Sequence, residues 1–105
     1  MLDRLASRLE QYMDLVSARQ RLVASNIANA DTPGYKTRDI DFQAEFRNLI
    51  RGTEPRVEEV RGLTAKNDGN NVSLDREARL LAENALRFNV ASTLAKAEIR
   101  AVKRA

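Results

Sequence analysis

Histidine, cysteine and tryptophan are absent from this chain of 105 residues, and aromatic residues account for only 5% of it. The chain therefore has no imidazole base, no thiolate nucleophile and no usual set of zinc ligands, so only carboxylates, amines and hydroxyl groups remain for catalysis. No disulfide can form, and a chain without thiols suits an oxidising and a reducing compartment equally. We expect a protein with no catalytic residue, no cofactor and no metal site.

Long apolar runs are also absent. No stretch approaches the roughly 18 apolar residues that a membrane span requires, and no apolar segment of the kind found in a cleaved signal peptide follows the first residues. Charged residues make up 31% of the chain and hydrophobic residues 43%, which is close to the composition of an ordinary globular protein. We expect one folded domain with neither a membrane span nor a cleaved signal peptide.

Apolar residues spaced by three and four positions characterise residues 1–31 and predict an amphipathic N-terminal helix. Pro33 disfavours helical geometry at the residue before it, and Gly34 can supply the positive φ of a type II turn. We therefore expect the helix to end near Asn29 or Ala30. The apolar positions of its packing seam are Leu5, Leu9, Met13, Val16, Val23 and Ile27.

Residues 32–72 contain most of the turn-forming residues of the chain and few apolar ones. This composition predicts a turn followed by an extended, flexible connector. An apolar patch within it favours a short helix from Phe42 to Ile50. A small β-hairpin around Asp68 and Gly69 is the less favoured alternative, because good strand sequences are missing on both sides of that turn.

No glycine or proline interrupts residues 73–105, and Ser73 or Asp75 can cap a helix at the start of this segment. Apolar residues recur every seven positions in two interleaved sets, as in a coiled-coil seam. This seam consists of Leu74, Ala78, Leu81, Ala85, Phe88, Ala95, Ile99 and Val102. A further apolar set follows another face of the same helix and consists of Leu86, Val90, Leu94, Ala97 and Ala101.

The fold class that follows is all-α, with two long amphipathic terminal helices that form an elongated helical hairpin or coiled coil. A largely irregular middle, with room for a short helix or a small β-hairpin, joins them. A rod of two helices leaves one side of each helix exposed, so apolar residues on a second face indicate that neighbouring copies or partners complete the core.

The most informative stretch runs from Asn26 to Tyr35. A helix end followed by a Pro-Gly turn explains its residue types, but their order resembles the Asn-x-Ala-Asn-x-x-Thr-Pro-Gly-Tyr signature near the N-terminus of bacterial flagellar rod and hook proteins. The matching residues are Asn26, Ala28, Asn29, Thr32, Pro33, Gly34 and Tyr35. Residues 68–77 and 82–88 resemble the same family and follow in the same order.

The resemblance implies a structural, non-enzymatic subunit of the flagellar basal-body rod, which crosses the periplasm. It further implies export in an unfolded state by the flagellar type III apparatus, without a cleaved signal peptide. The implied partners are this export apparatus, other copies of the chain and other flagellar rod and base proteins, with no nucleic acid and no direct membrane span. A Phe-x-x-x-hydrophobic pattern resembles the motif that early export substrates offer to the export gate, although a packed helical turn explains it equally well. This pattern involves Phe42, Phe46 and Ile50.

Two alternatives come from the residues themselves. The net charge of +3 and the excess of arginine suit a small basic helical nucleic-acid-binding protein, but acidic residues alternate with the arginines and no aromatic platform accompanies them. An enzyme that uses the neighbouring carboxylates of Asp39 and Asp41 has little support, because nothing in the sequence suggests a pocket that would separate their pKa values.

Overall fold

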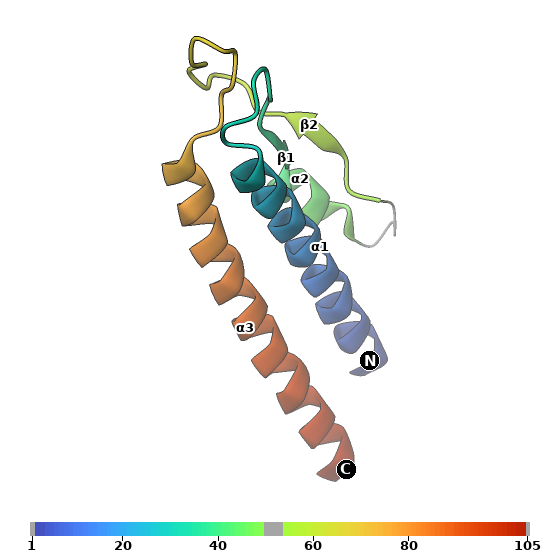
Figure 1. The fold of residues 1–105 in the computed structure, drawn as a ribbon. Helices are drawn as coiled ribbons and strands as arrows, with labels where there is room; N and C mark the ends of the chain where they lie inside the picture. The colour runs from blue at the N-terminus through green and yellow to red at the C-terminus, as the bar shows by residue number, and fades with distance from the viewer. Residues whose placement is uncertain (1, 50–53, 105) are drawn as a thin grey trace.

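The computed structural model of the chain describes residues 2–49 and 54–104 and has the shape of a rod, with extents of 61 × 24 × 17 Å (Figure 1). Two long helices at the ends of the sequence dominate it, and the described residues of the connecting segment contain one short helix and two short strands. The fold class expected from the sequence is confirmed. In chain order the elements are α1 (Leu2–Ala28), β1 (Arg38–Ile40), α2 (Phe42–Arg47), β2 (Val57–Glu59) and α3 (Leu74–Arg104).

The two long helices, α1 and α3, run antiparallel to each other as a hairpin (Figure 1). α1 ends at Ala28, just before the expected position, because Pro33 follows within one and a half turns. α3 begins after Ser73, whose hydroxyl oxygen accepts a hydrogen bond from the Arg76 backbone N–H at 3.2 Å. Of the two candidate caps, Ser73 is therefore the residue that caps α3.

The connector contains more ordered contacts than its composition suggests. β1 and β2 pair antiparallel, with Arg38 opposite Glu59 and Ile40 opposite Val57. The sequence suggests a β-hairpin at another place, around Asp68 and Gly69. The structure has a turn there without flanking strands. The Gly69 N–H closes this turn on the Lys66 carbonyl at 2.8 Å, and the Asp68 carbonyl accepts from the Gly34 N–H at 2.9 Å.

Helix α2 is shorter than the range expected for it. It starts after Asp41, whose carboxylate accepts a hydrogen bond from the Ala44 N–H at 3.2 Å, and it ends at Arg47. Ile50, the expected last residue, lies outside the described residues. The asparagine that follows the helix, Asn48, closes it with backbone bonds to the preceding turn.

A small apolar core lies where α1 meets β1 and α2. Its buried residues are Leu15, Val16, Ile40 and Phe42. The Tyr12 ring packs edge-on against the Phe42 ring, with centroids 6.0 Å apart, and the Arg87 guanidinium of α3 lies 4.3 Å from the centroid of the same ring. This core fixes the connector on α1, and a cation–π contact ties α3 to it. Over its described residues, neither long helix is apolar enough to cross a membrane.

Candidate functional site

The signature from Asn26 to Tyr35, which resembles that of flagellar rod and hook proteins, includes the end of α1 and the residues that follow it. The Asn29 side-chain amide and backbone N–H both donate to the carbonyl of Ser25, at 2.9 and 3.1 Å, and the Thr32 hydroxyl donates to the Asn29 side-chain oxygen at 3.0 Å. These bonds satisfy groups that a helix end leaves free. Among the signature residues Asn26 is buried, Asn29 and Tyr35 are half-buried, and Ala28, Thr32, Pro33 and Gly34 are exposed.

A tight turn follows the helix. The Tyr35 backbone N–H donates to the carbonyl of Thr32 at 3.2 Å, and Gly34 between them has φ +75°. A hydrogen bond across four residues, with Pro33 second and a glycine of positive φ third, is the arrangement of a type II turn. The positive φ expected for Gly34 is therefore confirmed.

Asn26 is the centre of a buried polar corner between α1, β1 and α3. Its side chain is 1% exposed, and its oxygen accepts from the Tyr35 hydroxyl at 2.9 Å and from the Arg38 N–H at 3.2 Å. Its amide donates to the Arg38 carbonyl at 2.8 Å and to the Glu77 carboxylate. One side chain thus joins three segments and uses both its donors and its acceptor.

A line of four charged residues extends this polar corner. Arg19 of α1 donates two hydrogen bonds, each of 3.1 Å, to the two carboxylate oxygens of Asp39 on β1. Arg76 of α3 pairs with the same Asp39 and, at 2.8 Å, with Glu77. Glu77 is completely buried, and burial of a carboxylate requires such partners. Both carboxylates are buried and both arginines half-buried, and the two cations balance the two anions.

The alternative role of Asp39 and Asp41 as catalytic carboxylates finds no support. Asp39 holds two arginines, and Asp41 caps α2, so each carboxylate has a structural partner.

The second family-like motif, residues 68–77, packs directly on the first. Asn70 is fully buried, and its amide donates to the carbonyls of Asn29 and Thr32, each at 2.8 Å. The Gly34 N–H donates to the Asp68 carbonyl at 2.9 Å. Two stretches that are separate in sequence therefore form a single structure at one end of the hairpin.

The two packing seams expected from the sequence have different environments. On α1, Val16 and Val23 are buried, Leu9 and Met13 half-buried, and Leu5 and Ile27 exposed. On α3, Ala95 is half-buried, whereas Leu74, Ala78, Leu81, Ala85, Phe88, Ile99 and Val102 are exposed. Within the chain, α3 instead buries Glu77, Asn84 and Ala91. The α3 seam is thus not the contact surface of the hairpin, because polar residues occupy that surface.

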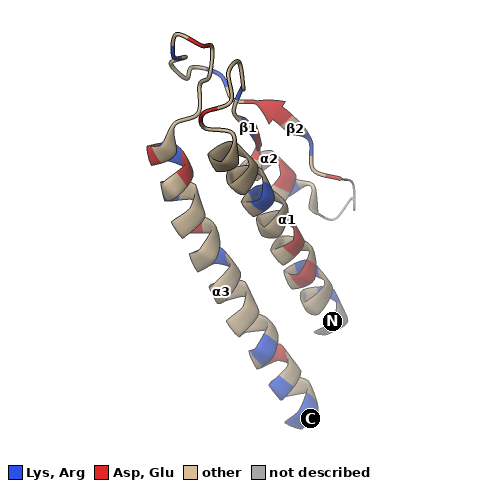
Figure 2. Cartoon of the chain, in the orientation of Figure 1, with Lys and Arg blue, Asp and Glu red and all other residues tan. Residues whose placement is uncertain are grey.

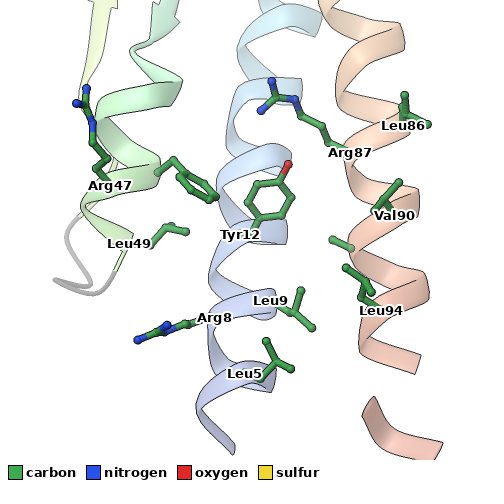
Figure 3. A pocket seen from close by; sticks show the side chains of 12 residues that line it. Leu5, Arg8, Leu9, Tyr12, Arg47, Leu49, Leu86, Arg87, Val90 and Leu94 are labelled. Carbon is green, nitrogen blue, oxygen red and sulfur yellow. The ribbon is translucent and has the colours of Figure 1, made fainter. Parts of the chain in front are cut away.

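An apolar groove of about 680 Å³ opens between α1, α2 and α3 (Figure 3). Leu9 of α1 and Leu94 of α3 point into the space between the two long helices, and Arg8, Arg47 and Arg87 lie among the lining residues. This groove adds a second apolar surface to the exposed seam of α3.

The residues of the expected export pattern lie beside this groove. Phe42 is buried, Phe46 is 49% exposed and lines the groove, and Ile50 lies outside the described residues. Tyr12 packs edge-on against the Phe46 ring as well, at 5.7 Å between centroids. The first phenylalanine of the pattern is therefore a core residue of the folded chain.

Basic and acidic residues alternate along much of the two long helices, and basic residues predominate only in the last turns of α3 (Figure 2). Several arginines are also paired: Arg19 and Arg76 bind carboxylates in the polar corner, and Arg87 pairs with Glu83 one turn away. Such pairs neutralise the charges that a track of nucleic-acid phosphates would need.

A helical hairpin whose polar corner serves structural contacts, and whose apolar faces remain exposed, suits the class of structural proteins. Comparison with known proteins agrees. Residues 13–36 match the model of a family described as flagella basal body rod protein. The flagellar basal body rod protein FlgB of Salmonella typhimurium is 33% identical over 128 aligned positions, which cover 95% of this chain and 93% of the relative.

Two further FlgB proteins are similar. That of Escherichia coli is 30% identical and covers the same shares, and that of Borrelia hermsii is 31% identical over 106 positions, with 76% of this chain and 78% of the relative covered. The chain therefore belongs to the FlgB family of flagellar basal body rod proteins. This membership confirms the expectation of a structural, non-enzymatic flagellar protein, and nothing favours the nucleic-acid-binding alternative.

The sequence predicts no tertiary contact for Arg19, Asn70, Arg76 or Glu77, although the last three lie in the motif of residues 68–77 and all four make polar contacts between segments. Their polar identity suggests exposure, and their partners are distant in the chain. Glu77 does offer one signal, since it begins a seven-residue series that continues through Asn84 and Ala91.

Proposed function

We propose that this chain is a subunit of the proximal flagellar rod that packs its terminal helices against further copies of itself and against other rod and base proteins. The assembly is a helical tube that crosses the periplasm. Membership of the FlgB family supports the placement in the rod. The contacts between subunits are supported by the surface of α3.

The exposed seam of α3 is the observation that carries this proposal. Leu81 and Phe88 are each 40% exposed and Ile99 is 55% exposed, although all three recur at helical spacing along one element. Scattered apolar residues are ordinary on a surface, but a continuous apolar stripe marks a contact. A neighbouring helix of another subunit would cover it.

The mode of delivery is part of the same proposal. The flagellar type III apparatus exports the chain unfolded, without cleavage of a signal peptide. Phe42 supports an unfolded substrate, because its side chain is 7% exposed and is accessible to a receptor only when the fold is open.

Charged substitutions in the seam test the assembly. Leu81→Asp or Phe88→Asp places a carboxylate in the contact between subunits, where burial of an unpaired charge costs several kcal/mol. Asn89→Asp adds the same charge to an exposed neighbour of Phe88, about 100° further around the helix, and serves as the matched control.

Assembly is followed by sedimentation of the purified chain and by motility of a strain that carries the variant as its sole copy. We expect the seam variants to keep the helical content of the parent and to lose assembly and motility, while Asn89→Asp keeps both. Normal motility of both seam variants would reject the seam as a subunit contact.

A further inference from the structure

The face of α3 that meets α1 is mainly polar. Glu77, Asn84 and Ala91, spaced by seven residues, are 0%, 1% and 2% exposed, and Glu98 continues the series with one carboxylate oxygen buried. Three of these four residues are polar. Paired helices with a seven-residue repeat normally bury apolar residues at such positions, so α3 presents the opposite arrangement to its partner within the chain.

An apolar alternative lies close by on the same helix. Leu74, Leu81 and Phe88 each precede a member of the buried series by three residues, which places them about 60° around the helix. A rotation of α3 by this angle would bring the apolar seam against α1. On α1, Val16 and Val23 are both 1% exposed, and Val16 belongs to the core cluster with Ile40 and Phe42. Burial of apolar surface alone therefore favours the rotated arrangement.

Two hydrogen bonds between the helices oppose this rotation. The Asn84 amide donates to the Gln20 side-chain oxygen at 3.1 Å, and the Asn26 amide donates to the Glu77 carboxylate. In the rotated arrangement both bonds would be broken, and Gln20 and Asn26 would face leucine and phenylalanine. An unpaired polar group in such a contact is strongly unfavourable.

The pair of Gln20 and Asn84 is not an optimal contact for stability. The Asn84 side-chain oxygen is buried and has no hydrogen-bond partner among the described residues. Buried polar residues in helix pairs have a known role of this kind, because they select one register or partner while they lower stability.

We propose that these two polar pairs, Gln20–Asn84 and Asn26–Glu77, select the rotational setting of α3 and thereby keep the Leu74–Leu81–Phe88 seam on the outside of the hairpin. The use of the seam by a neighbouring copy rests on the proposed function. The selection itself is a property of the single chain and is measured on it.

Thiol labelling reports which face of α3 is accessible, because the parent chain contains no cysteine. One cysteine is placed at Ala85, an exposed member of the seam, or at buried Ala91, and its rate of reaction with a maleimide is measured in dilute solution. In the parent background we expect Ala85→Cys to react faster than Ala91→Cys. Both changes leave the leucines and the phenylalanine of the seam intact.

Gln20→Leu removes the partner of Asn84 and makes the α1 face more apolar. In this background we expect the ratio of the two rates to invert, with position 91 now faster than position 85. Gln20→Ala removes the same hydrogen bond without adding bulk, and we expect it to move the ratio in the same direction. The exchange of the pair, Gln20→Asn with Asn84→Gln, restores a hydrogen-bonding pair and is the matched control that keeps the ratio of the parent.

A parent-like ratio in both Gln20 variants overturns the proposal. Should Gln20→Leu melt the hairpin, seen as loss of the helical circular dichroism signal and fast labelling at both positions, Gln20→Ala decides the question alone. The outcome is separate from rod assembly: an inverted ratio supports the selection even if the seam variants assemble, and an unchanged ratio rejects it even if they do not.

Discussion

The two ends of the hairpin differ in what their side chains bury. At the polar corner, where α1 ends and α3 begins, Asn26, Asn70 and Glu77 are at most 1% exposed and bond to several segments. At the opposite end no side chain of residues 4–14 or 92–104 is buried, although this end has many apolar residues. The comparison teaches that buried polar contacts hold the two long helices at one end of the hairpin, whereas the apolar residues of the other end remain exposed or half-buried.

The largest effect is expected from Glu77→Leu. The substitution removes the Glu77 carboxylate that accepts from Asn26 and pairs with Arg76, and removal of one partner of a buried ionic pair costs about 3–5 kcal/mol. Glu77→Gln keeps an oxygen for Asn26, so its loss of stability should be smaller. Urea unfolding followed by circular dichroism measures both.

The control for this substitution is Asp75→Leu, which removes an exposed acid from the same first turn of α3. It should cost about 0.3–1 kcal/mol through the helix dipole. Equal stability of Glu77→Leu and Asp75→Leu would mean that the polar corner does not hold the hairpin together.

A smaller effect is expected at the turn. Gly34 has φ +75°, and a side chain added there would meet nothing within 4 Å, so only the backbone conformation opposes a substitution. Gly34→Val should lose about 1–3 kcal/mol, because a β-branched residue is strained at positive φ. Gly34→Asn should lose less, since asparagine tolerates this region. Thermal melts rank the two variants, and the reverse order would contradict a type II turn.

The smallest effect is expected at the end of the hairpin opposite the polar corner. Leu5 is 43% exposed, so Leu5→Ser should change the free energy of unfolding of the isolated chain by only about 0.5 kcal/mol. The same exchange at Leu15, which is 3% exposed, should cost at least the roughly 2–5 kcal/mol of a buried leucine truncation. Similar losses at the two positions in urea unfolding would show that the ends of the hairpin do not differ as described.

Local signals in the sequence predict part of this structure well. Pro33 and Gly34 define the turn by their own conformational limits, and Ser73 marks the start of α3. The centre of the α1 seam, Val16 and Val23, is also predicted, because α1 buries the apolar stripe that its periodicity reveals.

Local signals could not predict which face of α3 packs against α1. Its periodicity identifies Leu81 and Phe88 as seam residues, but apolar periodicity does not distinguish a contact within the chain from a contact with a neighbour. The polar series through Glu77 and Asn84 becomes visible only with Asn26 and Gln20 opposite. Those partners are separated by 51 and 64 residues, beyond the reach of any local pattern.

The same separations govern the order in which the chain can fold. Contacts between residues so distant in sequence carry a large loop-closure entropy, and they cannot form before both partners have emerged from the ribosome or from a narrow channel. Asn26 therefore has no α3 carboxylate to bind until Glu77 appears. A chain that emerges from its N-terminus remains without the bond between Asn26 and Glu77 until more than two thirds of it is free, so the hairpin cannot close before most of the chain has emerged.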